Sequence, residues 1–504
     1  MSVTPSILAL DQGTTGTTAL VIAHDGRILG RDYSEFTQHF PRPGWVEHDA
    51  EEIRDVTIRV ARGALEAARN REPHRVEGIG ITNQRETIVL WDRETGRPVH
   101  RAIVWQDRRT AELCRTLRAQ GKEEEVKRRT GLLLDPYFSG TKLTWLFRHR
   151  PDLARRAEAG ELACGTIDSW LIHVLTRGQV HATDPTNASR TLLYDLESGG
   201  WGPELADILE VPAGILPEVR PSSGDFGVSQ GHYLGVEAPI AGVAGDQQAA
   251  LYGQGCWTAG SAKNTYGTGA FLLLHTGEEI VRSQHGLLTT VACDARGQPA
   301  FALEGSIFIA GAAIQWLRDG LGLLESAPDS EAMARSLEGN DGVYFVPAFV
   351  GLGAPHWDPD ARGAIFGLTR GTRDAHLVRA ALEAMAYGTE EVLRAQEADS
   401  GVRAPELRVD GGAADNDWLM QFQADLLGIP VQRPAVVETT ALGAAGLAGL
   451  QVGLWQSPQD FLQAQGEARV FNPQSEVDHR ERLRVGWKRA VEAARSFRAE
   501  SGNH

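Results

Sequence analysis

The chain has 504 residues, enough for roughly two to four domains that each bury a core. Its 50 basic and 66 acidic residues give a net charge of −16, which argues against nucleic acid or an anionic membrane as a partner. An anionic substrate must then be held by local donors or by a metal ion. The four cysteines stand far apart and form no CxxC pair, which argues against a disulfide framework or a zinc site.

The first predicted elements are two strands within residues 7–22, ILALDQGTTGTTALVI. An apolar run ends at Asp11, a Gly/Thr turn follows at 13–18, and a second apolar run begins at Ala19. Backbone N–H groups and hydroxyls of such a turn suit a phosphate, and Asp11 can hold the accompanying Mg²⁺ through oxygen. An ordinary hairpin is the alternative, because Gly-Thr turns are common. Asp11 also interrupts the apolar run, so no secretory leader is predicted.

The rest of the first half alternates strand-like and helical patterns. Residues 76–82 and 87–91 read as strands, and the charged stretch 50–70 reads as a helix. Around 212–239 the chain becomes rich in Pro, Gly and Ser, which predicts a loop region. An apolar strand is then predicted at 240–244.

The strand–turn–strand pattern occurs a second time at residues 263–276, KNTYGTGAFLLLHT. A duplicated unit of this kind suggests two related lobes with a nucleotide held between them. After Gly305, residues 306–317 are predicted to form a helix that places Gly311 and Gln315 on one face, at the i, i+4 spacing. A helix that simply packs through its small residues is the alternative.

A third glycine site lies within residues 407–431, LRVDGGAADNDWLMQFQADLLGIPV. A strand ends at Asp410, a Gly-Gly turn follows, and residues 416–427 have the apolar spacing of a helix that Gly428 ends. Such a corner lets a flat ring approach the backbone and can seat an adenosine. The later apolar run 441–450 is too short to span a bilayer and rich in Gly and Ala, so we expect a closely packed buried helix and a cytoplasmic protein without membrane insertion.

Segments along nearly the whole chain match one family in order. They are DQGTT (11–15), GITNQRET (80–87), AIVWQDRRT (102–110), DPYFSGTKLTWL (135–146), GDQQAALYGQ (245–254), KNTYGTGAF (263–271), GLGAPHWDPDARGAIFGLTRGT (351–372), RVDGGAADNDWLMQFQAD (408–425) and a signature at 363–383. With these segments the chain resembles the FGGY carbohydrate kinase family of the actin-like ATPase superfamily, and within it the members that act on glycerol.

The resemblance implies an α/β fold of two actin-like (ribonuclease H-like) lobes with a nucleotide cleft between them. Residues 1–253 would form the lobe with the first phosphate loop, the polyol pocket and the catalytic aspartate. Residues 254–504 would form the lobe with the second phosphate loop and the adenosine site. The implied reaction is the ATP-dependent, Mg²⁺-requiring phosphorylation of glycerol to sn-glycerol 3-phosphate, which serves glycerol catabolism and lipid precursor supply.

The resemblance also assigns the polyol side of the site. Asp246 is the expected general base, since transfer to an alcohol needs a carboxylate to accept the hydroxyl proton. The expected polyol-binding residues are Arg85, Glu86, Trp105, Tyr137, Asp246, Gln247 and Phe271, with Trp105 and Phe271 covering the carbon chain. The alternatives are a helix N-cap at Asp246 for residues 247–253, a surface ion pair at Arg85 and Glu86, and ordinary core for the two aromatic rings.

On the nucleotide side, the resemblance implies a phosphate cradle, a metal site and an adenosine border. The cradle would consist of Thr14, Thr15, Gly16, Gly267 and Thr268. Asp11 and Asp246 would hold Mg²⁺, directly or through water. Ribose and adenine would lie beside Gly311, Gln315, Gly412, Ala413 and Asn416.

The chain departs from the family pattern beside the first phosphate loop. Many members carry an arginine at the position of Thr18 and often a serine at Gly16. Loss of a guanidinium removes a charge-assisted donor, so we expect weaker ATP binding or a greater dependence on Mg²⁺, with activity retained.

Regulation and assembly are indicated only by resemblance. Residues 229–237 (SQGHYLGVE) lack the arginine with which some members bind an allosteric sugar bisphosphate. His232 stands where other members carry a histidine phosphorylated by a phosphotransferase carrier protein, and a solvated loop histidine is the alternative. Family members are often dimers or tetramers, so a homo-oligomer is expected.

The sequence also offers three competing functions. Residues 227–231 (GVSQG) match the G-x-S-x-G motif of hydrolases, but that motif needs a strand–turn–helix context and the flanks read as loops. A non-catalytic polyol sensor would not need Asp246 together with two intact phosphate turns. A sibling kinase acting on a pentose, a hexose or another polyol is disfavoured by the local match around Arg85, Tyr137 and Phe271.

Overall fold

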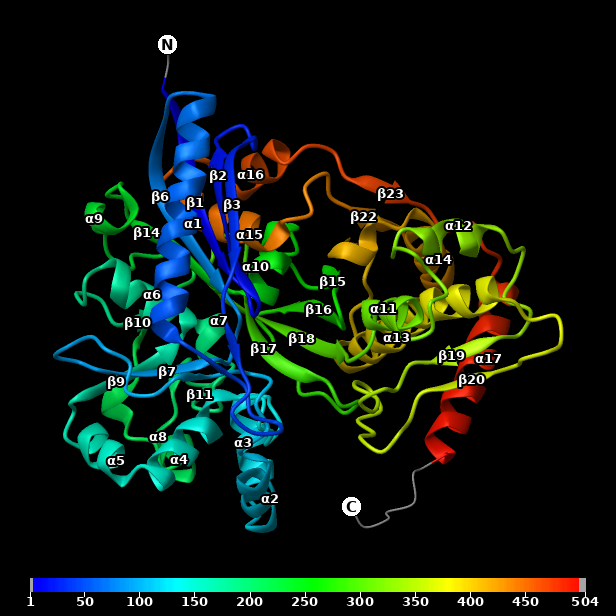
Figure 1. The fold of residues 1–504 in the computed structure, drawn as a ribbon, viewed down its shortest axis with the longest axis horizontal. Helices are drawn as coiled ribbons and strands as arrows, with labels where there is room; N and C mark the ends of the chain where they lie inside the picture. The colour runs from blue at the N-terminus through cyan, green and yellow to red at the C-terminus, as the bar shows by residue number, and fades with distance from the viewer. Residues whose placement is uncertain (1–2, 498–504) are drawn as a thin grey trace.

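The computed structural model describes residues 3–497 and is organised around two sheets (Figure 1). The first sheet has the strand order β14-β6-β1-β2-β3. Its strands are β1 (Thr4–Gln12), β2 (Gly16–Ala23), β3 (Ile28–Glu35), β6 (His74–Asn83) and β14 (Ile240–Gly245). Strands β1, β2 and β3 are antiparallel neighbours, whereas β6 runs parallel to β1 and β14 runs parallel to β6.

The second sheet has the order β17-β18-β16-β15-β21-β22-β23, in which β18, β16, β15, β21 and β22 take the places of β3, β2, β1, β6 and β14 in the first. Its strands are β15 (Ala262–Tyr266), β16 (Ala270–Gly277), β17 (Leu288–Cys293), β18 (Pro299–Ile307), β21 (Leu407–Asp410), β22 (Val431–Arg433) and β23 (Arg469–Phe471). The β15–β16 hairpin is antiparallel, and β21 pairs with β15 in parallel, as β6 does with β1. The predicted α/β class and the repeated strand–turn–strand unit are therefore confirmed.

Helices cover both faces of the first sheet, which explains why its strands are almost continuously apolar. Leu8 and Leu10 of β1 lie in one core with α1 (Ala50–Arg71), while Ile7 and Ala9 lie in another core with α15 (Thr439–Gln451). Alternate side chains of one strand thus face two helices that are far apart in the sequence.

Close packing of α15 depends on its glycines, as the composition predicts. A Cβ atom on Gly443 would lie 1.8 Å from the carbonyl oxygen of Ala249 in α10 (Asp246–Gly253). Because this neighbour is backbone, the two helices can approach only through a glycine at this position.

Among the helices of residues 3–497, none is both long and apolar enough to cross a bilayer.

Smaller elements surround the two sheets. A five-stranded sheet has the order β4-β5-β8-β7-β9, formed by β4 (Gln38–His39), β5 (Glu47–His48), β7 (Ile88–Asp92), β8 (Ala102–Ile103) and β9 (Leu162–Thr166). Three strand pairs are β10 (Ala182–Thr183) with β13 (Glu218–Val219), β11 (Tyr194–Asp195) with β12 (Gly200–Trp201), and β19 (Tyr344–Val346) with β20 (Ala364–Phe366). The remaining helices are α2 (Ala111–Ala119), α3 (Glu123–Thr130), α4 (Ser139–His149), α5 (Pro151–Glu158), α6 (Ile167–Leu175), α7 (Pro185–Ala188), α8 (Pro203–Ile208), α9 (Gly231–Leu234), α11 (Gly311–Asp319), α12 (Asp329–Arg335), α13 (Asp374–Ser400), α14 (Asp417–Leu427), α16 (Pro458–Ala464) and α17 (Val477–Ser496), with 3₁₀ turns at Ala213–Ile215 and Gly412–Asp415.

The predicted helix at 306–317 was wrong in its first turn. Ser306 and Ile307 are the last residues of β18, where they pair with Phe271 and Ala270 of β16. Because these residues belong to the sheet, the helix begins only at Gly311. The helix after the Gly-Gly turn has the predicted form. It begins at Asp417 and ends before Gly428, whose φ of 76° lies in the left-handed region that glycine adopts freely.

Candidate functional site

The two predicted phosphate turns are tight hairpin turns at the ends of their strands. In the first, the N–H of Gly13 donates to the carbonyl of Gly16 at 2.9 Å. In the second, the N–H of Gly267 donates to the carbonyl of Gly269 at 2.8 Å. Thr14 and Thr15 keep solvent exposure between β1 and β2. Hydroxyl groups and N–H groups thus remain at the rim of the first turn.

The start of α11 rests on the second turn. The N–H of Gly311 donates to the carbonyl of Gly267 at 3.0 Å, and the N–H of Ala312 donates to that of Thr268 at 3.1 Å. A Cβ on residue 311 would lie 2.7 Å from the Gly267 oxygen, which explains why a glycine stands there. The structure therefore brings Gly311 directly against the turn that carries Thr268, and places Gln315 one helical turn further on, exposed to solvent.

The Gly-Gly corner also adjoins the second turn. Gly411 has a φ of 84°, and a Cβ there would lie 2.3 Å from the carbonyl oxygen of Tyr266 at the end of β15. A Cβ on Gly412 would meet open space, which leaves its backbone accessible beside Ala413. Asn416 has a structural task as well, because its Oδ1 accepts from the N–H of Leu419 at 2.9 Å and caps α14.

Asp11 and Asp246 face each other closely enough for their charges to interact. Burial, and then the negative charge of Asp246, raise the pKa of Asp11 to about 7. Within residues 3–497, no group of three or more His, Cys, Asp or Glu side chains is placed to hold a metal ion. Asp11 and Asp246 together offer two carboxylates. That set fits Mg²⁺, which binds one or two carboxylates and completes its shell with phosphate oxygens and water.

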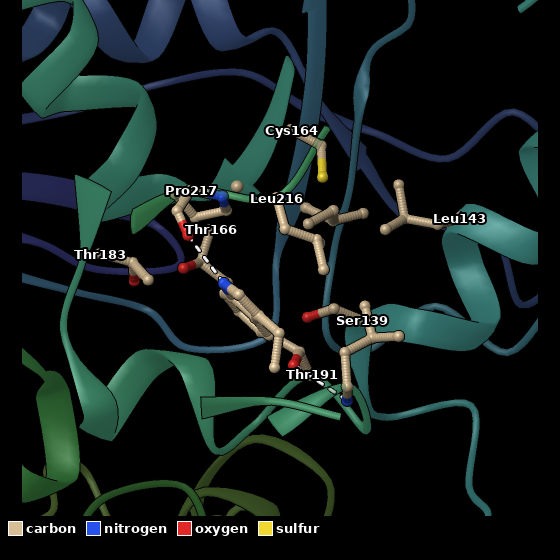
Figure 2. A pocket seen from close by; sticks show the side chains of 12 residues that line it. Ser139, Leu143, Cys164, Thr166, Thr183, Thr191, Leu216 and Pro217 are labelled. Carbon is tan, nitrogen blue, oxygen red and sulfur yellow. Dashed lines mark hydrogen bonds between the residues drawn. The ribbon is translucent and has the colours of Figure 1, made fainter. Parts of the chain in front are cut away.

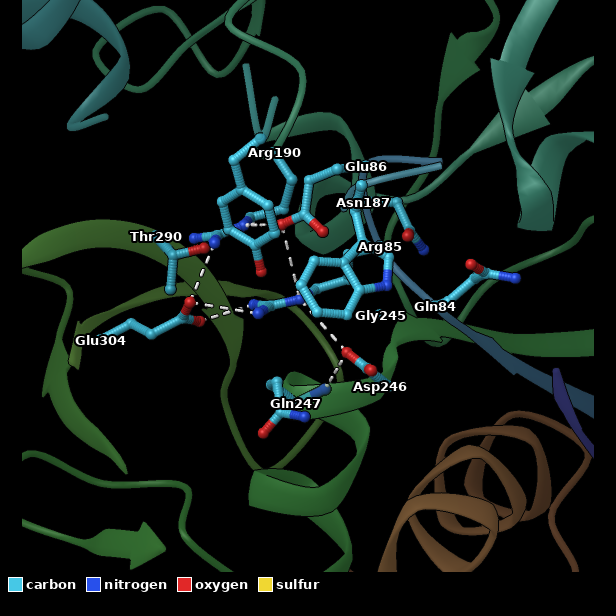
Figure 3. Close-up of polar contacts among 12 residues, drawn as sticks. Gln84, Arg85, Glu86, Asn187, Arg190, Gly245, Asp246, Gln247, Thr290 and Glu304 are labelled. Atoms are coloured by element: carbon cyan, nitrogen blue, oxygen red, sulfur yellow. Dashed lines mark hydrogen bonds and ion pairs between the residues drawn. The ribbon is translucent and has the colours of Figure 1, made fainter. Parts of the chain in front are cut away.

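Asp246 opens α10 directly after β14, one residue earlier than the predicted helix start. Its Oδ1 accepts from the N–H of Gln247 at 2.7 Å and lies 3.2 Å from Nε of Arg85 (Figure 3). The side chain of Asp246 is 32% exposed. Within the described residues its Oδ2 accepts no hydrogen bond. This arrangement leaves one carboxylate oxygen free to accept a proton.

Arg85 and Glu86 form a buried pair, so the alternative of a surface ion pair is wrong. Each side chain is 2% exposed. Glu86 has a φ of 60°, and the N–H of Thr87 donates to the carbonyl of Arg85 at 2.7 Å across it. A left-handed backbone at a non-glycine residue costs about 1–3 kcal/mol, and such strain concentrates at functional sites. The carbonyl of Glu86 is in turn fixed by the hydroxyl of Ser139 at 2.8 Å.

Two residues that sequence reasoning missed complete this pair, namely Arg190 and Glu304 (Figure 3). Nη1 and Nη2 of Arg85 donate to the two oxygens of Glu304 at 2.6 and 3.1 Å. Arg190 donates through Nε to Glu86 at 2.7 Å and through Nη2 to Glu304 at 2.9 Å. Burial alone would raise the pKa of Glu304, but the guanidinium groups of Arg190 and Arg85 lower it to about 2.

Two of the aromatic residues predicted for the polyol side lie against each other. The rings of Trp105 and Tyr137 meet edge to face with centroids 5.5 Å apart. Nε1 of Trp105 donates to Oγ1 of Thr14 at 2.8 Å and so contacts the first phosphate turn. Phe271 is partly buried in β16 beside Leu273, whose partner across the sheet is Glu304. The structure therefore brings Trp105 and Tyr137 into direct ring contact.

Two buried lysines were also missed. Nζ of Lys142 donates to the carbonyls of Pro136 and Tyr137, each at 2.6 Å, and so fixes the turn that carries the Tyr137 ring. Nζ of Lys263 donates to Oε1 of Gln247 at 2.6 Å. Burial lowers the pKa of both lysines to about 8. Each lysine is the only charged residue of its segment, SGTKLTWLF (139–147) and SAKNTYGTGAF (261–271), and this was the signal that could have indicated both.

The pocket in Figure 2 is a different feature. Its lining includes none of the predicted site residues. The lining residues are Ile88, Ser139, Leu143, Cys164, Gly165, Thr166, Thr183, Thr191, Leu193, Trp201, Leu216 and Pro217. Most of this surface is apolar, so the pocket offers little to a phosphate or a polyol.

His232 lies on the surface, in the short helix α9. Arg62 of α1 donates to the carbonyls of His232 and Tyr233 at 2.5 and 2.6 Å, which fastens α9 to that helix. The neighbouring Ser229 is buried, and its hydroxyl donates to the carbonyl of Val236 at 3.2 Å. A helix does follow the GVSQG motif, contrary to the loop expected there, but a buried, engaged serine is no exposed nucleophile.

Comparison with known proteins gives matches along nearly the whole chain. The model for the N-terminal domain of the FGGY family of carbohydrate kinases matches residues 6–253, and that for its C-terminal domain matches residues 262–452. A glycerol kinase from Deinococcus radiodurans is 56% identical over 495 residues, covering 98% of both chains. One from Oceanobacillus iheyensis is 55% identical over 496 residues, covering 98% of this chain and 99% of its own. The structure of Plasmodium falciparum glycerol kinase with ADP superimposes with a TM-score of 0.93 at 35% identity, covering 98% of this chain and 99% of that one.

Proposed function

Because the chain belongs to the FGGY family of carbohydrate kinases, we propose that it transfers the γ-phosphoryl group of ATP to glycerol, giving sn-glycerol 3-phosphate. One structural observation supports the proposal independently of the similarity to relatives. The hydrogen bond from Trp105 to Thr14 joins the ring wall of the polyol pocket to the phosphate turn, so acceptor and donor sites share one boundary. Such closeness is what direct phosphoryl transfer needs.

Glycerol needs polar partners for three hydroxyls and an apolar wall for its carbons. Arg85, Glu86 and Gln247 supply the polar partners, together with the hydroxyl of Tyr137. The rings of Trp105 and Tyr137 supply the wall, and we assign Phe271 to it as well. Burial raises the pKa of Tyr137, which keeps its hydroxyl protonated and able to donate.

Asp246 acts as the general base. A terminal hydroxyl of glycerol gives its proton to a carboxylate oxygen of Asp246 while its oxygen forms a bond to the γ-phosphorus. The bond from that phosphorus to the bridging oxygen of ATP breaks, and ADP leaves with the electron pair. The hydrogen bond from the Gln247 N–H holds the carboxylate in place during this step.

The nucleotide occupies the region between the two hairpin turns. Its phosphates are held by Thr14, Thr15, Gly16, Gly267 and Thr268, and its adenosine by Gly311, Gln315, Gly412, Ala413 and Asn416. Asp11 and Asp246 would hold Mg²⁺, directly or through water, and the bound ion would neutralise charge on the phosphoryl oxygens. Closure of two lobes, residues 1–253 and 254–504, excludes water from the reaction.

The test is ADP release by the purified protein with Mg²⁺ and ATP, comparing glycerol with pentoses, hexoses and tetritols. Saturable activity that is much stronger with glycerol supports the proposal. Preference for another polyol would move the assignment to a sibling kinase of the same fold, and no turnover with any of them would favour a sensor. Homo-oligomer formation, phosphorylation of His232 by a carrier protein and a cytoplasmic location stay predictions.

A further inference from the structure

A single carboxylate of the second sheet holds the charged pair on the polyol side. Glu304 lies in β18, and its side chain is fully buried. Its two oxygens accept from Arg85, which follows β6 of the first sheet, and from Arg190, which follows α7 (Figure 3). The polyol side is thus assembled from segments of both sheets.

The cluster of Arg85, Glu86, Arg190 and Glu304 has no net charge, and its buried side chains can pair with few other groups. Arg85 and Arg190 carry two positive charges, and Glu86 and Glu304 carry two negative ones. The four side chains are at most 2% exposed. A buried ion that loses its partner cannot turn to water, so it must turn to another charged group nearby.

Two carboxylates besides Glu304 lie near Nε of Arg85, that of Asp246 at 3.2 Å and that of Glu86 at 3.8 Å. Asp246 is the nearer of the two and is therefore the first alternative partner. In the structure both Nη atoms of Arg85 are taken by Glu304, so only Nε faces Asp246, at 3.2 Å. Nη1 also donates to Oε1 of Gln248 at 3.2 Å. Guanidinium groups bind carboxylates best through two parallel N–H donors. Glu304 therefore prevents Arg85 from forming that two-donor pair with Asp246.

Glu304 also orients Glu86 through Arg190. Nη2 of Arg190 is bound by Glu304, which directs its Nε at Oε1 of Glu86 at a distance of 2.7 Å. Within the described residues, Oε2 of Glu86 accepts no hydrogen bond, so this oxygen is available to a polyol hydroxyl. One carboxylate thereby sets the positions of both residues of the pair.

We propose that Glu304 is a positioning residue of the polyol site, which holds Arg85 away from Asp246 and aligns Glu86 through Arg190. The identity of the polyol as glycerol rests on the proposed function. The positions of the side chains do not depend on it.

The first test is Glu304→Gln, with steady-state kinetics for both substrates. Release of Arg85 toward Asp246 should raise the KM for glycerol and lower kcat, each by roughly ten- to a hundredfold, because small misplacements at a reacting centre have effects of this size. The KM for ATP should change by less than about twofold, since Glu304 contacts neither phosphate turn. Glu304→Asp keeps the charge and should recover part of the loss that Glu304→Gln causes.

Glu390 offers a matched control on the same half of the chain. It is a buried carboxylate of α13 shared by two arginines, Arg394 and Arg484, with Nε of Arg484 at 2.7 Å. Glu390→Gln should lower the melting temperature without changing the KM for glycerol. If Glu304→Gln has the stability loss of Glu390→Gln and a wild-type KM for glycerol, Glu304 is only structural and the proposal is overturned.

Two further measurements keep the proposal open to refutation. Arg190→Lys retains the positive charge but cannot donate to Glu86 and Glu304 at the same time through a planar guanidinium, so it should raise the KM for glycerol. This variant tests the proposal even if Glu304→Gln does not fold. A crystal structure of Glu304→Gln, or of Arg190→Lys in its place, reads the positions directly. Arg85 paired with Asp246 in the first, or a displaced Glu86 in the second, supports the proposal, and unchanged side chains overturn it. Failure of the wild type to use glycerol would overturn the proposed function and leave this structural comparison to decide the positioning role.

Discussion

Nε1 of Trp105 donates a hydrogen bond of 2.8 Å to Oγ1 of Thr14, although the two residues are 91 positions apart. A hydroxyl group has one proton to donate. Because the indole occupies an acceptor position on this oxygen, the proton of Thr14 stays free to donate to a phosphoryl group. The ring that we propose as a wall of the polyol pocket therefore also contacts the proposed phosphate turn.

Trp105→Phe tests this relationship, since it keeps an aromatic ring beside Tyr137 and removes the N–H donor together with part of the indole ring. A typical hydrogen bond contributes about 0.5–1.5 kcal/mol, so the KM for ATP should rise by roughly two- to twelvefold. The KM for glycerol should change less. Thr14→Ser retains the hydroxyl and serves as the control. A rise in the KM for glycerol alone would mean that the indole N–H has no part in phosphate binding.

Asp246→Asn tests the general base. The amide oxygen of asparagine can still accept from the N–H of Gln247, so α10 should keep its start. The loss of a proton acceptor should lower kcat by about 10²–10⁴-fold with little change in melting temperature. A decrease of less than about tenfold would instead assign Asp246 a purely positioning role.

Thr18→Arg tests the departure from the family pattern. Thr18 pairs directly with Asp11 across β1 and β2, so side chains at the two positions project from the same face of the sheet. A guanidinium there can donate to a phosphate, and we expect a lower KM for ATP, most clearly at limiting Mg²⁺. Thr18→Lys supplies the charge without the fork and should give a smaller effect. Unchanged kinetics would show that position 18 does not contact phosphate.

His48 predicts a pH dependence of stability. It is fully buried, with Nε2 2.7 Å from Oε1 of Gln38, whose amide donates to the carbonyl of Thr14 at 3.0 Å. Burial lowers the pKa of His48 from 6.5 to about 3. The unfolded chain therefore takes up the proton first as the pH falls. Stability from this group is full above 6.5 and is lost toward pH 3, by about 1.4 kcal/mol per pH unit.

Urea unfolding of the wild type and of His48→Gln at about pH 7 and about pH 5 measures this effect, because the glutamine cannot titrate. The free energy of unfolding should fall more steeply in the wild type than in the variant. Parallel slopes would mean that His48 is protonated equally well in the folded and unfolded chain.

The sequence predicts well where one local pattern decides the structure. The apolar runs of β1 and β14, the charged helical stretch of α1 and the glycine that ends α14 are of this kind. The start of α11 was misplaced because the pairing of Ser306 and Ile307 with β16 overrides a local pattern that fits a helix.

The charged cluster of the polyol side escaped prediction for a related reason. Glu304 stands alone in an apolar strand, and its partners Arg85 and Arg190 are 219 and 114 residues away. Nothing near Glu304 in the sequence indicates that it meets two guanidinium groups. Such partnerships are set by how the sheets meet, which is not encoded in any short segment.

The position of α15 has a consequence for how the protein is made. Ile7 and Ala9 of the first strand are covered by a helix that spans residues 439–451, and the indole of Trp455 donates to the carbonyl of His24 across 431 positions. While the ribosome is still synthesising the middle of the chain, this face of β1 has no cover. The first sheet can complete its core only when almost the whole polypeptide has emerged, so the amino-terminal strands must stay protected from association for most of translation.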